Sequence, residues 1–488
     1  MDLAQLSLKH LQSVVAIDSQ SDEASTSIPT TEGQKVLAAA VGDFFASLGA
    51  RVERDAHANI IATLPARNST RRPVALMVHL DTARGTLAVP ALRTTRWDGS
   101  PLRFPKNETL QVDLETYPSA EEFCGQTLVH GEGDFPFGLD DKLGLTHLMS
   151  LAVLLRERPD IPHPELLLIG RPDEEVGRME AVEGLATLLA ERGVRFGYTI
   201  DGILPFEVNV ENFNAAGASV WFQGEPVPAA RSWAVRLGGV NTHGATAKAE
   251  GYRGATRFGA ALVKAGVSVV GFESDPLRDC DAQLLVHGED PTAAVESIVG
   301  PHLGRGASFS VAAVEPTAGH TAARKMLEWV ASFQDSAPGF TLLCEDSDGH
   351  DGYSNPYRAR ADEDSLRLDV RLRDFTPEGL QARIEHVARQ AGELCNTHHH
   401  QYVNMGPRLA DRPELVDLPV AAGEAIGVAV RKQPIRGGTG VDPFLDAGVP
   451  IANLGTGYFA PESEKEFTSL EMMERHALWL LELVKRLA

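Results

Sequence analysis

Residues 74–81 read VALMVHLD, an apolar run that ends in two side chains able to do chemistry. Five consecutive apolar residues are typical of a strand buried on both faces of a sheet. Because side chains alternate along a strand, His79 and Asp81 point to the same side. In parallel α/β sheets, sites form beyond the carboxyl ends of the strands. The stretch therefore predicts a buried strand with a candidate site at its end, although this pair alone is weak support for function.

Strand and helix patterns alternate on both sides of this stretch. Short apolar runs predict strands at 59–64, 165–170 and 196–201, and helical spacing of apolar residues covers 6–18, 34–48, 144–155 and 470–487. Such alternation indicates an α/β fold. We therefore expect a mixed, mostly parallel sheet with flanking helices.

The pattern changes over residues 214–404. This part combines strand patterns at 219–223, 233–237 and 366–372 with helical patterns at 243–265 and 377–394. Segregated strands and helices of this kind indicate an α+β domain inserted into the first one. We therefore expect a catalytic domain formed by residues 1–213 and 405–488, and an inserted domain formed by residues 214–404.

Composition excludes several classes of protein. The 488 residues include 45 Lys and Arg against 67 Asp and Glu, a net charge of −22 at pH 7, with 43% hydrophobic residues. These values are typical of a globular protein, and the acidic balance argues against nucleic acid or an anionic membrane as partner. The N-terminus lacks a secretory pattern and no apolar run could cross a bilayer. With four scattered cysteines (Cys124, Cys280, Cys344 and Cys395), we expect buried, reduced thiols and a cytoplasmic location.

Acidic residues recur where predicted strands end or helices begin. Asp140 precedes the helix near residue 144, Glu174 and Glu175 follow the strand at 165–170, and Asp201 ends the strand at 196–201. A helix cap explains Asp140 equally well, and paired acids are common on surfaces. Together with His79, however, these residues would bring one imidazole and several carboxylates to one rim. Such a set suits two divalent ions that share a carboxylate, with a further carboxylate to activate water.

Several short segments carry a resemblance that extends over nearly the whole chain. They are PTTEGQ (29–34), HLDT (79–82), GQTL (125–128), LDDK (139–142), PDEEVG (172–177), ENFNAA (211–216), His243 with TAK (246–248), RDF (373–375) and PIRGGT (434–439). In order and spacing they resemble the cocatalytic dizinc peptidases of the aminoacylase–carboxypeptidase superfamily. Within that superfamily they are most similar to the peptidase T family of tripeptide aminopeptidases. The fold implied is zinc-exopeptidase-like, with an inserted lid domain.

The resemblance implies two divalent metal ions, with zinc expected and manganese or cobalt as alternatives. It assigns one ion to His79 and Asp201, the bridging position to Asp140 and the second ion to Glu175. The family's last ligand is a histidine, and Glu462 stands at that position here. A carboxylate can also ligate zinc, but it makes the second site more anionic and leaves its occupancy open.

The resemblance also implies roles in the reaction. Glu174 would be the general base, and Asp81 would orient His79 and tune its basicity. The inserted domain would cover the site and contact the peptide, with His243 at the scissile carbonyl and Arg373 at the C-terminal carboxylate. Family members commonly dimerise through this domain, so a homodimer is an expected partner arrangement.

The expected function is a metallo-aminopeptidase that releases the N-terminal residue from small peptides by attack of metal-activated water. Two alternatives stay open. A related amide or N-acyl amino acid hydrolase would keep the dimetal core and change the substrate through the long inserted domain. A non-catalytic metal- or peptide-binding homologue would follow if Glu462 disables the second metal site. The sequence Gly438-Thr439-Gly440 also departs from the family's Gly-Gly-Thr-Asp, which leaves the preference for tripeptides open.

Overall fold

The computed structural model describes residues 2–336, 350–362 and 365–488, which form two compact units. The first unit comprises Met1–Leu102, Asp113–Asn212 and Asn404–Ala488, and the second comprises Arg103–Val112 and Phe213–Val403. The segment Arg103–Val112, expected in the catalytic part of the chain, groups instead with the second unit.

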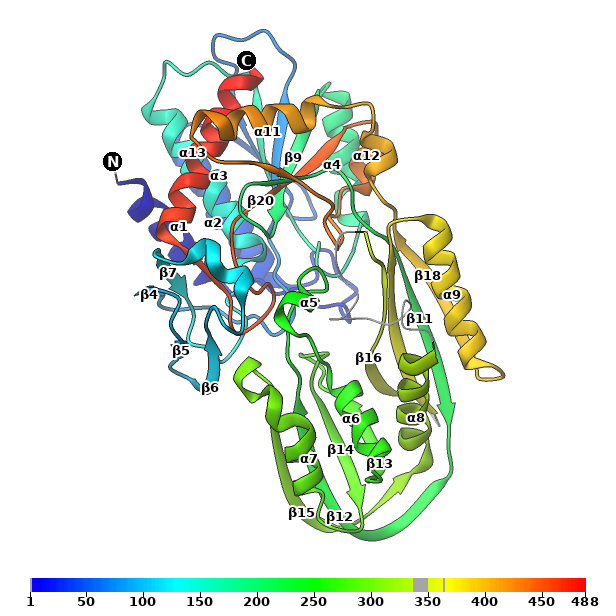
Figure 1. Cartoon of the computed structure of the whole chain (residues 1–488). Coiled ribbons are helices and arrows are strands. Elements are labelled where there is room, and N and C mark those ends of the chain that lie inside the picture. Colours follow the sequence, from blue (N-terminus) through cyan, green and yellow to red (C-terminus); the bar gives the residue numbers. More distant parts are fainter. Residues whose placement is uncertain (1, 337–349, 363–364) are drawn as a thin grey trace. The chain divides into compact units, whose positions relative to one another are not determined.

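A mixed eight-stranded sheet forms the centre of the first unit (Figure 1). In spatial order its strands are β1 (Arg51–Arg54), β2 (Ile60–Leu64), β8 (Leu166–Arg171), β3 (Val74–His79), β9 (Phe196–Gly202), β20 (Ile451–Gly455), β10 (Glu207–Asn209) and β19 (Arg431–Lys432). The four central strands β8, β3, β9 and β20 run parallel to one another. Both β3 and β8 are buried at every position, as their apolar sequences predict. The carboxyl ends of the central strands therefore meet at one edge of the sheet.

Helices flank this sheet. They are α1 (Leu3–Val15), α2 (Glu32–Ser47), η1 (Pro118–Phe123), α3 (Leu139–Glu157), α4 (Glu180–Glu191), α10 (Gly406–Leu409), α11 (Glu414–Ala425), α12 (Asp442–Asp446) and α13 (Leu470–Leu487). Helices α1, α3 and α13 pack against one another (Figure 1), and α3 also contacts β3 and β9. A small sheet adds β21 (Phe467–Ser469), β7 (Thr127–His130) and β4 (Arg93–Arg96). The predicted α/β class with flanking helices is confirmed.

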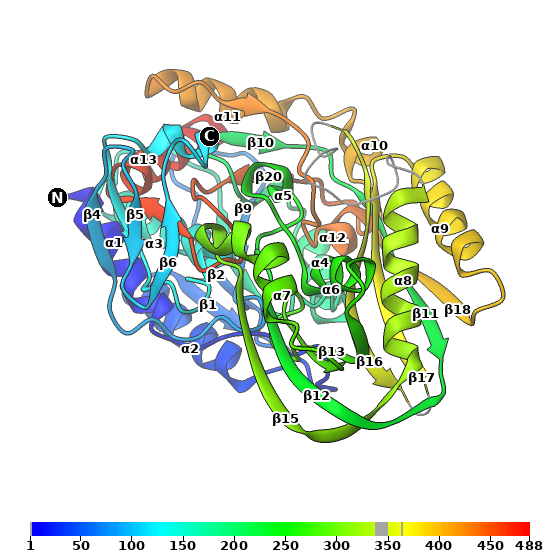
Figure 2. The same cartoon turned by 60° about the horizontal axis from the view of Figure 1, so that its bottom comes forward.

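The second unit contains two antiparallel four-stranded sheets. One is formed by β16 (Tyr353–Asp362), β17 (Ser365–Asp374), β11 (Asn214–Gln223) and β18 (Asn396–Tyr402), and the other by β13 (Ser268–Ser274), β14 (Ala282–His287), β12 (Pro226–Gly238) and β15 (Ser308–His320). Figure 2 shows the long strands β12 and β15 side by side. The helices are α5 (Ala247–Glu250), α6 (Ala255–Lys264), α7 (Thr292–Val299), η2 (Gly300–Arg305), α8 (Thr321–Ser336) and α9 (Pro377–Ala391). A further hairpin pairs β5 (Leu102–Phe104) with β6 (Asn107–Val112).

Some local predictions were wrong. The single helix expected at 243–265 is divided into α5 and α6, because Gly251 ends α5 in a left-handed conformation with φ of 71°. Residues 398–400, three consecutive histidines, lie on the exposed strand β18. Among the described cysteines, Cys280 is buried as expected, whereas Cys124 and Cys395 are exposed; Cys344 lies outside the described residues.

Within the described part of the chain, the helices are too short or too polar to span a bilayer.

Candidate metal centre

The carboxyl ends of β8, β3 and β9 deliver the first side chains of the candidate site. His79 ends β3, and its register partner on the neighbouring parallel strand is Arg171, the last residue of β8. Asp201 lies near the end of β9, on the other side of β3. The local cause is the same in each case: a buried apolar strand ends and the first polar side chains follow.

His79 has its two ring nitrogens in different surroundings. Nδ1 lies 2.9 Å from the carbonyl oxygen of Asp81 and 3.3 Å from the Oδ1 of its carboxylate. A carbonyl oxygen only accepts, so Nδ1 carries a proton and Nε2 is left to act as the ligand atom. Nε2 lies 2.8 Å from Asp140 Oδ1 and 3.3 Å from Asp201 Oδ1. One imidazole nitrogen and two carboxylate oxygens therefore converge, as the ligands of a divalent cation do.

The start of α3 supplies two adjacent aspartates with different surroundings. Asp140 and Asp141 depart from helical backbone angles, so their carboxylates diverge. The Tyr458 hydroxyl donates to Asp140 Oδ2 at 3.1 Å. Asp141 instead accepts backbone N–H bonds, from His79 at 3.1 Å and from Gly144 at 3.2 Å. Asp141 thus ties the helix to the strand, whereas Asp140 faces the imidazole.

A tight turn after β8 presents the paired glutamates. Asp173 adopts the left-handed conformation with φ of 55°. Its carboxylate accepts from the backbone N–H of Thr30 at 3.0 Å, from the Thr30 hydroxyl at 2.6 Å and from Gln34 Nε2 at 2.7 Å. These bonds hold the turn in place and account for the PTTEGQ segment, which spans the start of α2.

Asp81 fixes the two glutamates themselves. Its Oδ1 accepts from the backbone N–H of Glu174 at 3.0 Å, and its Oδ2 accepts from that of Glu175 at 3.1 Å. Asp81 is fully buried, so each carboxylate oxygen has a defined partner. One carboxylate therefore joins the ends of β3 and β8 and sets where Glu174 and Glu175 point.

The structure brings four of the five predicted ligands together. Ligand atoms of His79, Asp140 and Glu175 lie within 4.8 Å of one another, and so do those of His79, Asp141 and Asp201. The fifth, Glu462, lies on the loop after β20 with φ of 56°, and its backbone N–H donates to Glu466 Oε1 at 2.5 Å. Glu462 is not a member of either group, although its charge acts on Glu175.

The electrostatics of the site indicate a deficit of positive charge. Burial raises the pKa of Glu175 well above its ordinary value, and the charges of Asp140 and Glu462 add to this effect. Burial likewise raises the pKa of Asp201 to about 7. Glu175 Oε1 is buried without a hydrogen-bond partner among the described residues. A divalent cation would satisfy that oxygen and offset the buried charge, so the donor set fits metal ions.

Burial also raises the pKa of Glu174, and the nearby Arg171 guanidinium opposes this shift. A carboxylate with a raised pKa is a better proton acceptor near neutral pH than an ordinary one. Glu174 therefore has the electrostatic surroundings of a base, next to residues suited to metal ligation.

The two predicted peptide contacts lie in the second unit. His243 precedes α5 and its Nδ1 accepts the backbone N–H of Ala245 at 3.1 Å. Arg373 lies on β17, where its Nη1 donates to the carbonyl oxygens of Ala216 at 3.2 Å and Leu372 at 2.9 Å. Its guanidinium also lies over the ring of Tyr402, 5.3 Å from the centroid. The roles expected of His243 and Arg373 stay predictions.

Comparison with known proteins identifies relatives over the whole chain. Peptidase T of Macrococcus caseolyticus (strain JCSC5402) is 25% identical over 494 residues, covering 98% of this chain and 98% of the relative. Peptidase T of Exiguobacterium sibiricum is 27% identical over 497 residues, covering 99% and 98%. The chain is homologous to peptidase T over its full length. No family profile matches it.

A solved structure agrees with this peptidase T homology. The tripeptidase of Staphylococcus aureus Mu50 superposes with a TM-score of 0.56 at 15% identity, covering 99% of this chain and 98% of that one. At this identity the likeness concerns the fold, which is shared along the whole length.

Three residues of the site were not predicted from the sequence. Arg171 could have been noticed, because it directly follows the apolar run 166–170, and Asp141 was visible within LDDK. Tyr458 carries no sequence signal, since a single tyrosine in a loop is ordinary. Its hydrogen-bond partner, Asp140, is 318 positions away in the sequence.

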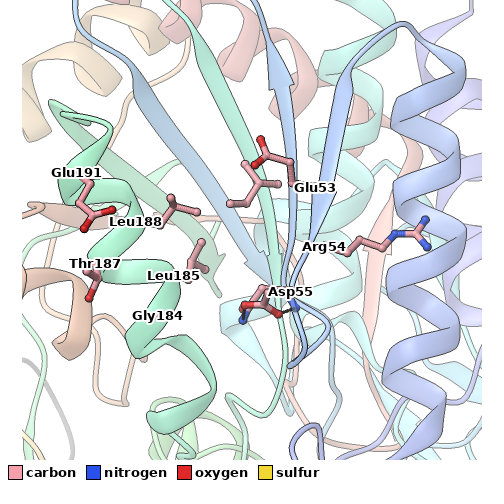
Figure 3. A pocket seen from close by; sticks show the side chains of 10 residues that line it. Glu53, Arg54, Asp55, Gly184, Leu185, Thr187, Leu188 and Glu191 are labelled. Carbon is pink, nitrogen blue, oxygen red and sulfur yellow. Dashed lines mark hydrogen bonds between the residues drawn. The ribbon is translucent and has the colours of Figure 1, made fainter.

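A hollow elsewhere in the first unit does not share these features. It has a volume of about 500 Å³ and lies between the end of β1 and α4 (Figure 3). Its lining includes Glu53, Arg54, Asp55, Leu185, Leu188 and Glu191. None of the groups of metal ligands found in the described residues lies there, so the rim at His79 is the better candidate for chemistry.

Proposed function

We propose that this protein is a metal-dependent hydrolase that releases the N-terminal residue from small peptides, tripeptides among them. The observation that carries the proposal is the convergence of His79, Asp140, Glu175 and Asp201 on one rim, with Glu174 beside them. The full-length homology to peptidase T supports peptides as the substrate class.

Two divalent ions would be held by these residues. His79 and Asp201 would hold one ion, Glu175 the other, and Asp140 would lie between them. Mixed nitrogen and oxygen donors suit zinc best, with manganese or cobalt as alternatives. Bound ions of this kind polarise the scissile carbonyl and lower the pKa of water. Glu462 would contribute negative charge next to Glu175 and would become a ligand if its carboxylate turned towards that ion.

The protein's own residues then move the proton. Glu174 takes a proton from the attacking water and delivers it to the nitrogen of the leaving amine, which converts a poor leaving group into a neutral one. Asp81 acts through its neighbours: it fixes the backbone of Glu174 and Glu175 and keeps His79 Nδ1 facing an acceptor. This division of labour explains why the site needs both Asp81 and Glu174.

The second unit would supply substrate contacts. We assign His243 to the scissile carbonyl and Arg373 to the C-terminal carboxylate of the peptide, for which a guanidinium fork is well shaped. Arg373 would have to exchange its bonds to two backbone carbonyls for that contact. A lid role for residues 214–404, dimerisation through them and a cytoplasmic location stay predictions.

The test is hydrolysis of a panel of free and N-acylated di- and tripeptides by the purified full-length protein. Activity should require an unblocked N-terminus, disappear after stringent chelation and return with added Zn²⁺ or Mn²⁺. Preference for N-acylated substrates would favour the amide hydrolase alternative instead. No hydrolysis by metal-loaded protein would overturn the proposal and favour a non-catalytic homologue.

A matched pair of variants assigns the base. Glu174→Gln should lower kcat by roughly 10²–10⁴-fold, because it removes the proton acceptor and nearly preserves the shape. Glu180→Gln makes the same change on an exposed position of α4 and should leave kcat unchanged. Metal content should be equal in both variants. A Glu174→Gln variant as active as the wild type would remove Glu174 from the mechanism.

A further inference from the structure

A buried arginine lies against the outer side of the metal centre. Arg171 is 1% exposed, and its Nη2 donates to the carbonyl oxygen of Thr439 at 2.9 Å. The same nitrogen lies 3.9 Å from Glu174 Oε1 and 3.9 Å from Asp201 Oδ2. Both distances exceed hydrogen-bonding range, so the guanidinium acts on these carboxylates through its charge.

The guanidinium occupies space that a glycine leaves open. Gly440 has φ of 55°, and a Cβ built there would collide with Arg171 Nη1 and lie 2.9 Å from Glu174 Oε1. The residue before it, Thr439, provides the carbonyl that anchors Arg171. Arg171 and the segment 439–440 therefore fit together as one arrangement at the edge of the site.

This arrangement gives the two halves of the site different charges. Asp201 turns Oδ1 towards His79 Nε2 and Oδ2 towards Arg171. A cation held by Asp201 thus has a permanent positive charge nearby. Glu175 instead feels an additional negative charge from Glu462. The half built on Asp140 and Glu175 is therefore more anionic than the half built on His79 and Asp201.

We propose that Arg171 acts as a built-in cation that makes the two metal positions unequal, so that the Asp201 side binds its divalent ion more weakly than the Glu175 side. The proposal rests on the metal site of the proposed function. Like charges repel strongly at short range in a poorly solvated site, and the guanidinium cannot be neutralised at physiological pH. Arg171 also positions Asp201 and Glu174, because attraction to a fixed charge holds both carboxylates in place.

Direct metal titration tests this without reference to activity. Chelated, metal-free full-length protein is titrated with Mn²⁺ and with Zn²⁺ by calorimetry, and we expect a tight and a weak binding step. Arg171→Met keeps an unbranched side chain, shorter than that of arginine, and removes its charge, so the weak step should tighten by about tenfold, while the tight step changes by less than about twofold. Arg171→Lys keeps the charge and should retain the difference in affinity between the two steps. Arg156→Met, on an exposed position of α3, controls for net charge.

Two ligand variants establish which position is which. Asp201→Asn should abolish the weak step and keep the tight one, whereas Glu175→Gln should abolish the tight step. These variants decide which position is the weak one even if Arg171→Met fails to fold, which circular dichroism and thermal melting would reveal. Loss of the tight step in Asp201→Asn, or an unchanged weak step in folded Arg171→Met, would overturn the proposal.

The outcome is separable from that of the proposed function. Unequal metal steps that respond to Arg171→Met, in a protein that hydrolyses no peptide, would sustain this inference and refute the function. Peptide hydrolysis by a protein whose metal-binding steps are unchanged in Arg171→Met would support the proposed function and refute this inference. A protein that binds no divalent ion would refute both.

Discussion

Two buried imidazoles of the first unit, His79 and His147, show opposite ways of placing an ionisable group inside a protein. Helix α3 contributes to both environments, since its first turn carries Asp140, which faces His79, and His147 lies farther along the helix. Each imidazole is at most 1% exposed. Burial lowers the pKa of both, but around His79 the carboxylates of Asp201, Asp140 and Asp81 more than offset this effect and raise its pKa.

Among the described residues, no carboxylate acts on the pKa of His147. Its Nε2 donates to the carbonyl oxygen of Thr456 at 2.9 Å, and its ring stacks on that of His476 with centroids 5.0 Å apart. The ring of Phe206 stacks in turn on that of His476, with centroids 4.2 Å apart. Burial lowers the pKa of His147 to about 4. This histidine layer, formed by His147 and His476, is therefore neutral in the folded protein.

The difference shows that burial selects neutral groups where the chain must be stable by itself and tolerates charge where a ligand completes the site. In the histidine layer both imidazoles stay neutral and the aromatic rings supply packing. At the metal centre the chain assembles more carboxylates than its own cations balance. The first region should be self-sufficient, whereas the second should depend on added ions.

Metal removal should separate the two regions most strongly. A free metal concentration a thousandfold above the Kd of a site stabilises the folded state by about 4 kcal/mol for that site, because unfolded chains lack it. Chelation should therefore lower the unfolding temperature of the wild type, and readdition of Zn²⁺ or Mn²⁺ should restore it. Differential scanning calorimetry measures the shift.

The His147→Gln variant is the control for this comparison. It alters the histidine layer, which is distinct from the site, so chelation should lower its unfolding temperature by the same amount as in the wild type. An unfolding temperature that is insensitive to chelation in both proteins would contradict a metal-dependent site.

Acidification should affect the histidine layer next most strongly. The folded-state pKa of His147, about 4, lies below the unfolded value of 6.5, so the unfolded state binds more protons between these pH values. The stability that neutral His147 provides is complete above pH 6.5 and is lost as the pH falls towards 4. The loss amounts to roughly 3 kcal/mol, at 1.36 kcal/mol for each pKa unit.

Urea unfolding of chelated protein at several pH values between 7.5 and 4.5 measures this dependence. His147→Gln can still donate to Thr456 but cannot be protonated, so the variant should lose less stability than the wild type on acidification. His398→Gln, on the exposed strand β18, is the matched control and should follow the wild type. Equal pH dependence in all three proteins would mean that His147 is not the group responsible.

The positions of the site residues could be predicted from the sequence, whereas the charges that act on them could not. The apolar run 74–78 and the strand predicted at 165–170 identified the sheet. Parallel strands bring their carboxyl ends to one edge, so His79, Glu175 and Asp201 could be placed on one rim. The PTTEGQ segment entered as part of a resemblance, and only the structure shows that Thr30 and Gln34 anchor Asp173.

Other features depend on contacts that no local pattern encodes. Arg171 and Gly440 are far apart in sequence, and neither residue by itself indicates that the guanidinium occupies the space where a Cβ of residue 440 would lie. Tyr458 could not be predicted either, because its place in the site depends on one hydrogen bond to Asp140, which is distant in sequence. The division of helix 243–265 was missed because a glycine within a helical pattern can either be accommodated or end the helix.

The smallest expected effect concerns the crowding beside the metal centre. Gly440→Ala places a methyl group against Arg171 in a left-handed backbone conformation. Gly427→Ala introduces the same methyl group at φ of 71° with nothing within 4 Å, so only the strained backbone conformation lowers its stability. Both should lose about 1 kcal/mol for that conformation, and Gly440→Ala should lose roughly 1–3 kcal/mol more through overpacking. Urea unfolding of the chelated variants measures the difference. Equal losses would show that the guanidinium moves aside easily, and that Arg171 and the segment 439–440 do not form a rigid arrangement.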